Sequence, residues 1–329
     1  MRECGIGGGI GQPDNDEEAA MIHQIGLVGL GQIAQKQHLP AIAANPDFAL
    51  VAAASLDGTA PGIPVYRDHL AMLAAHPDIE AVIICTPPRA RRQVAVDALL
   101  AGKHVMLEKP PAATLGEFAH IAALATAQHR VLHATWHSQY NPAVERLRDL
   151  LAGQSIAAML MEWKENFHQF HPGQRWIWEA GGFGVFDMAI NGLSVMARIF
   201  DPMPFVLSAE LRVPSDADTP IAAEVRFGLG DGAAPLTAAF DWDWVGDPKR
   251  EVSVTTGTGS MLVLTESGRR LTVDGCLLID GERNEYRDIY RHFATMLRDG
   301  TSSLDVVPLQ LVADIMLQGK PIAVGPVGG

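Results

Sequence analysis

The chain has 329 residues, 48% of them hydrophobic, which is enough apolar material for two folded domains and excludes a disordered or fibrous protein. Its 25 Lys and Arg against 38 Asp and Glu give a formal net charge of −13, so we expect neither nucleic acid nor an anionic membrane as a partner. Three scattered cysteines, Cys4, Cys85 and Cys276, form neither a disulfide framework nor a zinc-binding spacing and indicate a reducing cytoplasm.

Residues 1–20 contain five glycines between Gly5 and Gly11, followed by an acidic run. Because this segment has no hydrophobic periodicity, we predict a flexible extension, with Met21 as a candidate for the natural start. Its glycine cluster follows no strand and opens no helix, so we assign it no phosphate-binding role. We also expect no membrane helix and no signal peptide, because the required apolar segments are missing.

Strands alternate with helices from residue 21 to about residue 140. Such alternation predicts an α/β domain with a doubly wound parallel sheet, here a dinucleotide-binding Rossmann domain at 21–140. Thr114 and Glu117 have the spacing of a capping box, and Asn141 before Pro142 is typical of a helix start. The predicted strands lie at 24–28, 48–54, 81–85, 104–108 and 131–135, and the helices at 68–75, 91–101 and 114–128.

Beyond about residue 152, within a second domain predicted at 141–329, the sequence shows mostly the period-two alternation of half-buried strands. We predict a substrate-binding and oligomerisation α+β domain with an open, mostly antiparallel sheet. The predicted strands lie at 207–213, 221–227, 236–244, 251–255 and 270–274, and the helices at 186–200, 288–297 and 309–317.

A glycine-rich turn, Gly29-Leu30-Gly31-Gln32-Ile33-Ala34, directly follows the first predicted strand and leads into a helical stretch. A dinucleotide pyrophosphate needs backbone N–H groups at a helix N-terminus, and glycine where a Cβ would block its approach. A tight turn without a ligand is the alternative, but the strand, the helix and the further βα units favour cofactor binding.

The end of the second predicted strand decides between NAD and NADP and has the sequence Ser55-Leu56-Asp57. An acidic side chain there accepts from a ribose 2′-hydroxyl, whereas a 2′-phosphate needs a cation. No Lys or Arg occurs in this turn, and Asp57 would repel a phosphate, although Ser55 could donate to one. We therefore expect NAD or NADP, with NAD favoured.

Four segments, including the glycine-rich turn, carry a family resemblance: GLVGLGQIA at 26–34, AVIICTPP at 81–88, AGKHVMLEKP at 101–110 and GGFGVFDMAIN at 181–191. They resemble the glucose-fructose oxidoreductase/inositol dehydrogenase family (Gfo/Idh/MocA), whose most specific motif here is Glu108-Lys109-Pro110. Within it, ATWHS at 134–138, WKENFHQFHPGQRWIW at 163–178 and VPSDADTPIAAE at 213–224 resemble the bacterial D-galactose and L-arabinose 1-dehydrogenases.

The resemblance implies oxidation of a neutral aldopyranose at C1 to its lactone, with hydride transfer to nicotinamide and oligomer contacts through the open sheet. It also implies a set of cofactor-binding residues: Gly29, Gly31, Gln32, Ile33, Ser55, Thr86, Pro87, Glu108 and Lys109.

Oxidation at C1 needs a base within hydrogen-bond reach of the anomeric hydroxyl. Lys109 follows the fifth predicted strand, at the edge where such sheets bind ligands. Asp187 and Asn191 are four residues apart on a predicted helix and could meet one substrate. Much of the family has His at position 191, and since an amide exchanges no proton at neutral pH, we assign the base to Lys109 or Asp187 and hydroxyl binding to Asn191.

The resemblance implies that Glu165 and His171 contact the sugar, and we add His137 and Trp242 as further candidates. Core packing or a surface position is the alternative for each. His133 and His137 have the i, i+4 spacing of a metal pair, but they would be ~13 Å apart if the strand at 131–135 extended to His137, so we expect no metal site. Arg89, Arg91 and Arg92 at a predicted helix start are interpreted as a solvated face without a function.

The sequence thus predicts an NAD(P)-dependent aldose 1-dehydrogenase that acts as a homo-oligomer. Two alternatives remain open, namely a non-catalytic sensor of dinucleotide and sugar, and a dehydrogenase acting on a cyclitol or another sugar carbon.

Overall fold

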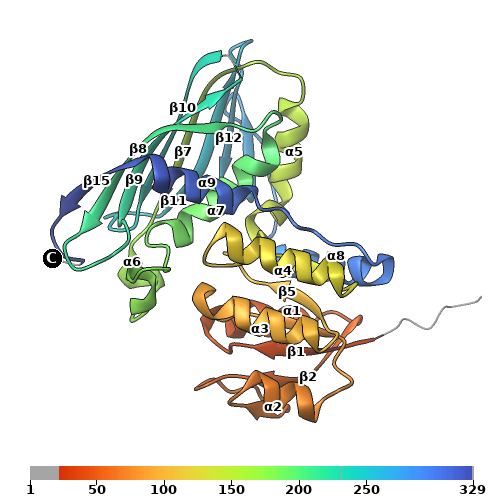
Figure 1. Cartoon of the computed structure of the whole chain (residues 1–329). Helices are drawn as coiled ribbons and strands as arrows, with labels where there is room; N and C mark the ends of the chain where they lie inside the picture. The colour runs from red at the N-terminus through yellow and green to blue at the C-terminus, as the bar shows by residue number, and fades with distance from the viewer. Residues whose placement is uncertain (1–21, 231, 328–329) are drawn as a thin grey trace, which may run out of the picture.

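Two β-sheets organise the chain, and each carries its own helices (Figure 1). The computed structural model describes residues 22–230 and 232–327. The predicted extension at 1–20, with its glycine cluster and Cys4, lies outside these residues. Within the described part, no helix combines the length and apolarity needed to cross a membrane.

The first sheet has six strands in the order β3-β2-β1-β4-β5-β6, and every neighbouring pair is parallel, as the alternating pattern predicts. Its strands are β1 (His23–Val28), β2 (Phe48–Ala54), β3 (Val65–Tyr66), β4 (Ala81–Ile84), β5 (His104–Leu107) and β6 (Leu132–Ala134). The helical elements between these strands are η1 (Ala34–His38), α1 (Leu39–Ala43), α2 (His69–Ala75), α3 (Pro88–Leu100) and α4 (Leu115–Ala127).

Both faces of this sheet are covered, which explains why its strands are almost wholly apolar. Successive side chains of a strand point to opposite faces, so Ile25 and Leu27 pack with α1 while Val28 joins the core under α2, α3 and α4. Thr114 caps α4 as predicted, because its hydroxyl accepts a hydrogen bond from the Glu117 N–H at 3.2 Å.

The second sheet is open and has nine strands in the order β14-β13-β12-β11-β7-β10-β9-β8-β15. The pairs β7–β10 and β8–β15 are parallel and the others antiparallel, which confirms the mostly antiparallel prediction. The strands are β7 (Ile156–Lys164), β8 (Phe205–Pro214), β9 (Ala222–Leu229), β10 (Gly232–Asp241), β11 (Lys249–Thr256), β12 (Met261–Thr265), β13 (Arg270–Val273), β14 (Cys276–Asp280) and β15 (Gly319–Val324).

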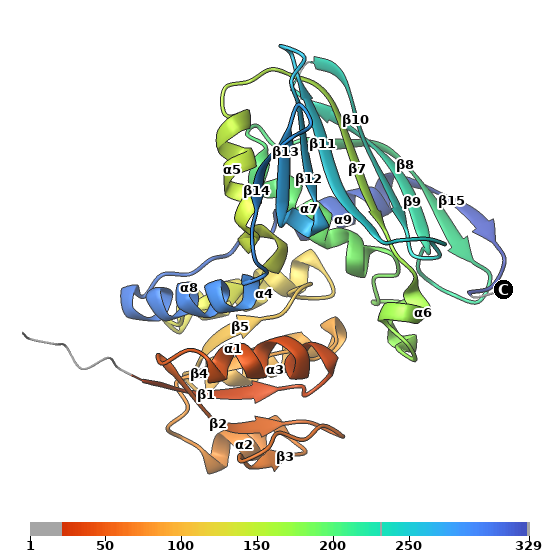
Figure 2. The ribbon, with the colours of Figure 1, turned by 180° about the vertical axis from the view of Figure 1, so that it is seen from behind.

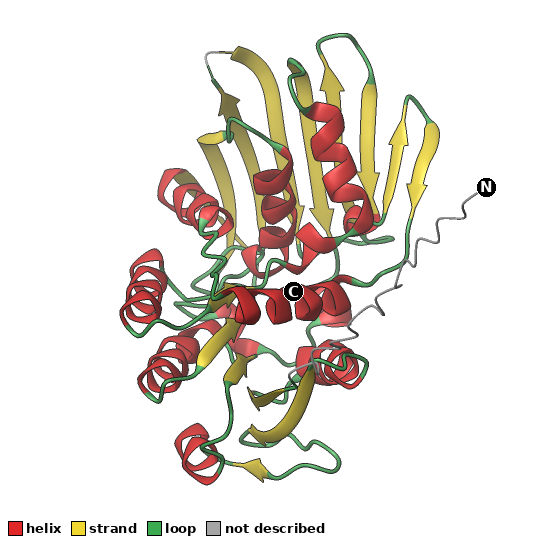
Figure 3. Ribbon diagram, turned by 90° about the vertical axis from the view of Figure 1, so that its right-hand side faces the viewer, coloured by secondary structure: helices red, strands yellow, loops and turns green. Residues whose placement is uncertain are grey.

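Helices lie against one face of this sheet, between it and the first domain (Figures 2 and 3). In the described chain no helix covers the opposite face, which Leu160 and Leu207 reach with about half of their surface exposed. The helical elements after β6 are η2 (His137–Tyr140), α5 (Pro142–Leu151), α6 (Phe167–Phe170), η3 (Arg175–Trp178), α7 (Phe186–Ile199), η4 (Glu266–Gly268), α8 (Glu285–Asp299) and α9 (Val307–Gln318).

Asn141 precedes α5 as predicted, but its side chain does not cap the helix. The amide instead donates to the backbone carbonyl of Ser267, at 2.8 Å, and so ties η4 to the start of α5. The helix start was correctly predicted, whereas the expected capping interaction is replaced by a tertiary hydrogen bond.

Helix α8 crosses from the second half of the sequence to the first sheet. Its buried side chains, including Ile289, Tyr290 and Phe293, pack with Leu27 and Ile42 in the core on the α1 side of that sheet. The predicted boundary near residue 140 therefore separates the two sheets, but the core of the first domain also requires α8.

Candidate active site

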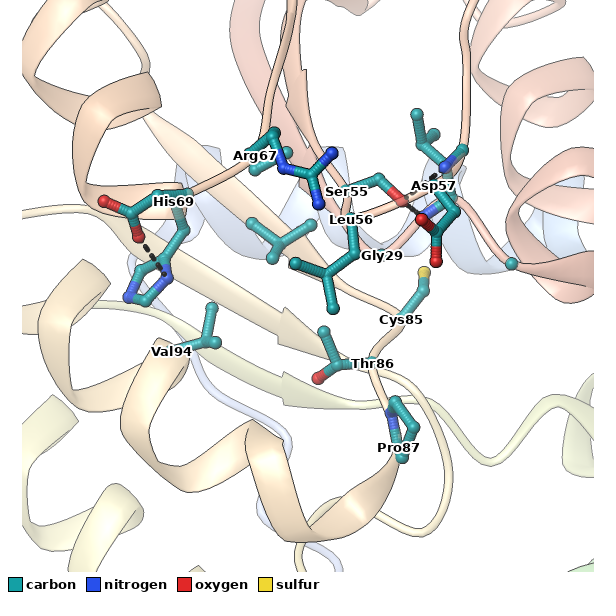
Figure 4. Close-up of a pocket in the computed structure, with 16 residues that line it drawn as sticks. Gly29, Ser55, Leu56, Asp57, Arg67, His69, Cys85, Thr86, Pro87 and Val94 are labelled. Carbon is teal, nitrogen blue, oxygen red and sulfur yellow. Dashed lines mark hydrogen bonds and ion pairs between the residues drawn. The ribbon is translucent and has the colours of Figure 1, made fainter. Parts of the chain in front are cut away.

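Two adjoining cavities follow the carboxyl ends of the strands of the first sheet. The first has a volume of about 530 Å³ and lies over the ends of β1, β2 and β4 (Figure 4). The second has a volume of about 440 Å³ and extends to residues of the second domain. Gly31, Cys85, Thr86 and Pro87 line both, so the cavities form one groove at the edge where open α/β sheets bind ligands.

The glycine-rich turn fits a dinucleotide. Gly29 has a φ of +95°, and a Cβ there would lie 2.8 Å from the backbone nitrogen of Thr86. A Cβ on Gly31 would meet no atom within 4 Å, because this glycine faces the open groove. The buried Thr86 hydroxyl has no hydrogen-bond partner in the described chain and lines both cavities. A pyrophosphate could use this close approach and this free donor.

Every predicted cofactor-binding residue lines at least one cavity, so the structure gathers the whole set in one groove. Those of the first cavity are Gly29, Gly31, Ser55, Thr86 and Pro87, and those of the second are Gly31, Gln32, Ile33, Thr86, Pro87, Glu108 and Lys109.

Lys109 and Asp187 meet in the second cavity from the two domains. Lys109 follows β5, and Asp187 lies in the first turn of α7. The Lys109 Nζ donates to the backbone oxygen of Asp187 at 2.7 Å and lies 3.3 Å from its carboxylate Oδ1. Both side chains are largely buried, at 14% and 7% exposure. The structure thus brings the expected amine and carboxylate together in a site with restricted access to water.

Asn191 is not among the residues that line this cavity. It lies one turn beyond Asp187 on α7, about 6 Å further along the helix axis. The role of Asn191 in binding a hydroxyl stays a prediction.

Of the four candidate sugar contacts, one lines the cavity and three do not. His171 lines the cavity, whereas Glu165, Trp242 and His137 do not. Trp242 as a pocket residue is a wrong prediction: its side chain is fully buried and packs against both Phe167 and Trp178. The tryptophan at the cavity is Trp176, from η3.

Glu165 joins the side chains that pack around His171. One of its carboxylate oxygens accepts from the indole N–H of Trp242 at 3.2 Å, and the other accepts from Arg250 at 3.0 Å. His171 stacks on Phe167 and meets Trp242 edge-on. Burial lowers the pKa of His171, the nearby Asp187 opposes this effect and Lys109 adds to it, so the imidazole is neutral at neutral pH.

His133 and His137 belong to different elements and do not share one strand. His133 is on β6 and stacks with Phe293, whereas His137 is on η2 and stacks with Tyr286. Burial and the nearby His292 lower the pKa of His133 to about 3. Among the described residues, no cluster of three or more His, Cys, Asp or Glu side chains could hold a metal ion.

Arg91 corrects the prediction of a solvated arginine face on α3. Its side chain is buried, at 4% exposure, and its Nη1 donates to the carbonyls of Glu108, at 2.5 Å, and of Pro110. These two carbonyls flank Lys109 in the chain. The periodicity of α3 gave no sign of this contact, because the acceptors belong to a loop after another strand. Arg91 therefore fixes the backbone that carries the catalytic candidate.

We expect Arg91→Met to lower kcat about tenfold, because the loop that directs Lys109 loses both hydrogen bonds from a charged group. The KM for the dinucleotide should change little, and Arg91→Lys should restore part of kcat. Steady-state kinetics measures both values. A lower melting temperature of Arg91→Met with an unchanged kcat would contradict a positioning role, because it would show that Arg91 only stabilises the fold.

Glu108 is buried in a network that joins η1, the end of β5 and α8. Its Oε1 accepts from Tyr286, at 2.7 Å, and from His38, at 3.1 Å, and its Oε2 accepts from the Lys109 N–H at 2.9 Å. Burial alone would raise the pKa of Glu108, but hydrogen bonding to His38 and the charges of His38, His137 and Arg91 hold it well below its usual range. Burial would lower the pKa of His38, but Cys85, Tyr290 and Glu108 raise it well above its ordinary value.

Comparison with known proteins assigns the chain to a family. Residues 23–135 match the oxidoreductase family with an NAD-binding Rossmann fold, GFO_IDH_MocA. The galactose 1-dehydrogenase of Pseudomonas fluorescens is 40% identical over 303 residues, which cover 92% of this chain and 97% of that protein. The chain belongs to the Gfo/Idh/MocA family. It is accordingly an oxidoreductase with a nicotinamide-dinucleotide domain.

Solved structures give a consistent comparison. The D-galactose-1-dehydrogenase crystal structure from Rhizobium etli has a TM-score of 0.87 and 44% identity, and it covers 93% of this chain and 98% of that one. A 3-ketoreductase from Actinomadura kijaniata, solved with NADP, has a TM-score of 0.79 at 17% identity and covers 92% and 99% of the two chains, so it shows the shared fold alone.

Proposed function

We propose that the chain oxidises a neutral aldopyranose, such as D-galactose or L-arabinose, at C1 to the lactone, with NAD or NADP. The observation that carries this proposal is the Lys109–Asp187 pair on the second cavity, directly beside the glycine-lined groove. The relatives with 40% and 44% identity, named galactose 1-dehydrogenases, support the substrate class. Asp57, which lines the first cavity, supports NAD.

When bound, the nicotinamide would supply the acceptor for the hydride of C1. The chain must remove the proton of the anomeric hydroxyl, and we assign this step to the Lys109–Asp187 unit. The proton passes to the Nζ of Lys109, which the backbone and side-chain oxygens of Asp187 hold in place. Arg91 holds the loop around Lys109, so the geometry of this unit is set before the sugar arrives.

Sugar recognition is assigned to the wall that the second domain contributes. The half-buried Trp176 offers an aromatic surface for the C–H face of a pyranose, and Gln174 and the neutral His171 can exchange hydrogen bonds with hydroxyls. Glu165 acts through His171 and Trp242, which it holds in place, rather than on the sugar.

A panel of aldoses with either dinucleotide tests the proposal. We expect the absorbance of reduced nicotinamide to rise with D-galactose or L-arabinose, and the initial product to be a lactone that hydrolyses to an aldonic acid. A keto-sugar as product would favour oxidation at another carbon, and dinucleotide binding with no turnover on any aldose or cyclitol would favour a sensor.

Two further proposals concern the cellular compartment of the enzyme and its self-association. Cys85 and Cys276 are free in the described chain, which supports a reducing compartment such as the cytoplasm. The exposed face of the second sheet carries Leu160, Leu207 and Leu277, each about half exposed. This apolar content supports self-association through that face, and the homo-oligomer stays a prediction.

A further inference from the structure

The ends of β2 and β3 place an arginine beside the turn that selects the cofactor. The Ser55 N–H donates to the carbonyl of Tyr66 at 2.8 Å, so Arg67, the next residue, leaves its strand next to Ser55. Ser55, Asp57 and Arg67 all line the first cavity (Figure 4). The turn at 55–57 itself contains no Lys or Arg, but the fold places Arg67, at the end of the neighbouring strand β3, beside it.

The side chains of Arg67 and Asp57 are exposed, and neither has a hydrogen bond or ion pair to another described residue. The other charged groups of this wall are engaged, because Asp68 caps α2 and His69 contacts Asp97 at 2.9 Å. The Ser55 Oγ accepts from the Gly58 N–H at 3.0 Å, which leaves its own proton available for donation. The wall therefore offers a guanidinium, a hydroxyl donor and one carboxylate to a ligand.

The position of Arg67 in the sheet separates it from the pyrophosphate. The glycine-rich turn follows β1, and Arg67 follows β3, two strands away in the order β3-β2-β1. Neighbouring strands are about 4.8 Å apart, so Arg67 starts about 10 Å from that turn, on the side of the adenosine ribose. A cation at this distance faces the 2′ position rather than the bridging phosphates.

We propose that Arg67 and Ser55 form a subsite for the 2′-phosphate of NADP, so that the chain binds NADP as well as NAD. Asp57 favours the 2′-hydroxyl of NAD and repels a phosphate, whereas Arg67 forms charge-assisted hydrogen bonds with that phosphate. The proposal rests on the proposed function only in placing a dinucleotide in the groove, and it adds a residue for NADP to the expectation of NAD or NADP.

Binding to the unliganded full chain tests this subsite without any sugar. The probes are adenosine 2′,5′-bisphosphate and adenosine 5′-monophosphate, titrated by calorimetry, with NADPH and NADH followed by fluorescence. We expect Arg67→Met to weaken the bisphosphate and NADPH about tenfold or more and to change the monophosphate and NADH less than about twofold. High salt should reduce the same difference.

Two further variants serve as controls. Asp57→Asn should strengthen bisphosphate binding, because it removes the repelling carboxylate. Arg146→Met, an exposed arginine on α5 without an ion pair in the described chain, should change neither ligand. An equal loss of both probes in Arg67→Met, as expected for stacking on the adenine, would overturn the proposal, and so would an unchanged affinity for the bisphosphate. If no aldose is oxidised, these binding results still decide the question.

Discussion

Lys109→Met is expected to lower kcat for aldose oxidation between about a hundredfold and ten-thousandfold, which is the usual contribution of a positioned acid or base. Methionine retains the length of the side chain and removes the amine, so the contact with the backbone oxygen of Asp187, at 2.7 Å, is lost. Binding of the dinucleotide should persist, because the glycine turn, Thr86 and the first cavity remain. Single-turnover kinetics and NADH fluorescence measure the two properties separately.

Two variants complete this experiment. Lys103→Met removes a surface lysine whose amine contacts the Pro77 carbonyl, and it should leave kcat unchanged. Asp187→Asn keeps the backbone oxygen that Lys109 contacts, so it should retain more activity than Lys109→Met. Near-normal turnover of the Lys109 variant, or a larger loss in Asp187→Asn, would contradict the assignment of the base to Lys109.

Glu108→Gln is expected to destabilise the protein by about 3 kcal/mol, near the lower end of the cost of breaking a buried ion pair, because His38 can release its proton. The variant leaves His38 and Tyr286 beside a neutral amide in a site with 2% exposure. Glu80→Gln is the matched control, since Glu80 pairs with His23 at 2.8 Å but is 40% exposed, and it should cost less than about 1 kcal/mol.

The pH dependence of this loss follows from the two pKa shifts. Glu108 has a lowered pKa when folded, so its stabilisation is present above its unfolded value near 4.5 and disappears as the pH falls through the folded value. His38 has a raised pKa when folded, so its stabilisation is complete below 6.5 and disappears as the pH rises through the folded value. The difference in the free energy of unfolding between wild type and Glu108→Gln should thus be largest between the two unfolded values, from about pH 4.5 to about pH 6.5.

Urea unfolding followed by circular dichroism at several pH values measures this difference. A difference that grows steadily towards alkaline pH would contradict an ionised His38–Glu108 pair, and equal losses in Glu108→Gln and Glu80→Gln would show that burial contributes nothing.

Local sequence patterns were sufficient where a residue's partner is close in the chain or repeats with a period. The cap of α4 by Thr114 and the glycine turn at 29–31 needed no tertiary information. Lys109 and Asp187 were found by the family motifs, and only the structure shows that they touch.

Residues whose role depends on a neighbouring strand or loop could not be found this way. Arg67 follows a strand of only two residues, which is too short for a periodic signal. The one indication of this strand in the sequence is an apolar pair between a Gly/Pro-rich turn and a helix cap. Arg91 was misjudged because its carbonyl acceptors lie in the loop after β5. Trp242 was preferred over Trp176, because alternation along a strand does not tell which end of the sheet faces a cavity.

Helix α8 has a consequence for how the protein is made. Its side chains complete the packing on the α1 side of the first sheet, yet it ends at Asp299 of a 329-residue chain. During translation the α1 side of the dinucleotide domain's sheet stays incompletely covered until most of the second domain has left the ribosome. A chimaera or truncation that ends near residue 140 would keep that face exposed to aggregation, so any transplant of this domain has to include the helix.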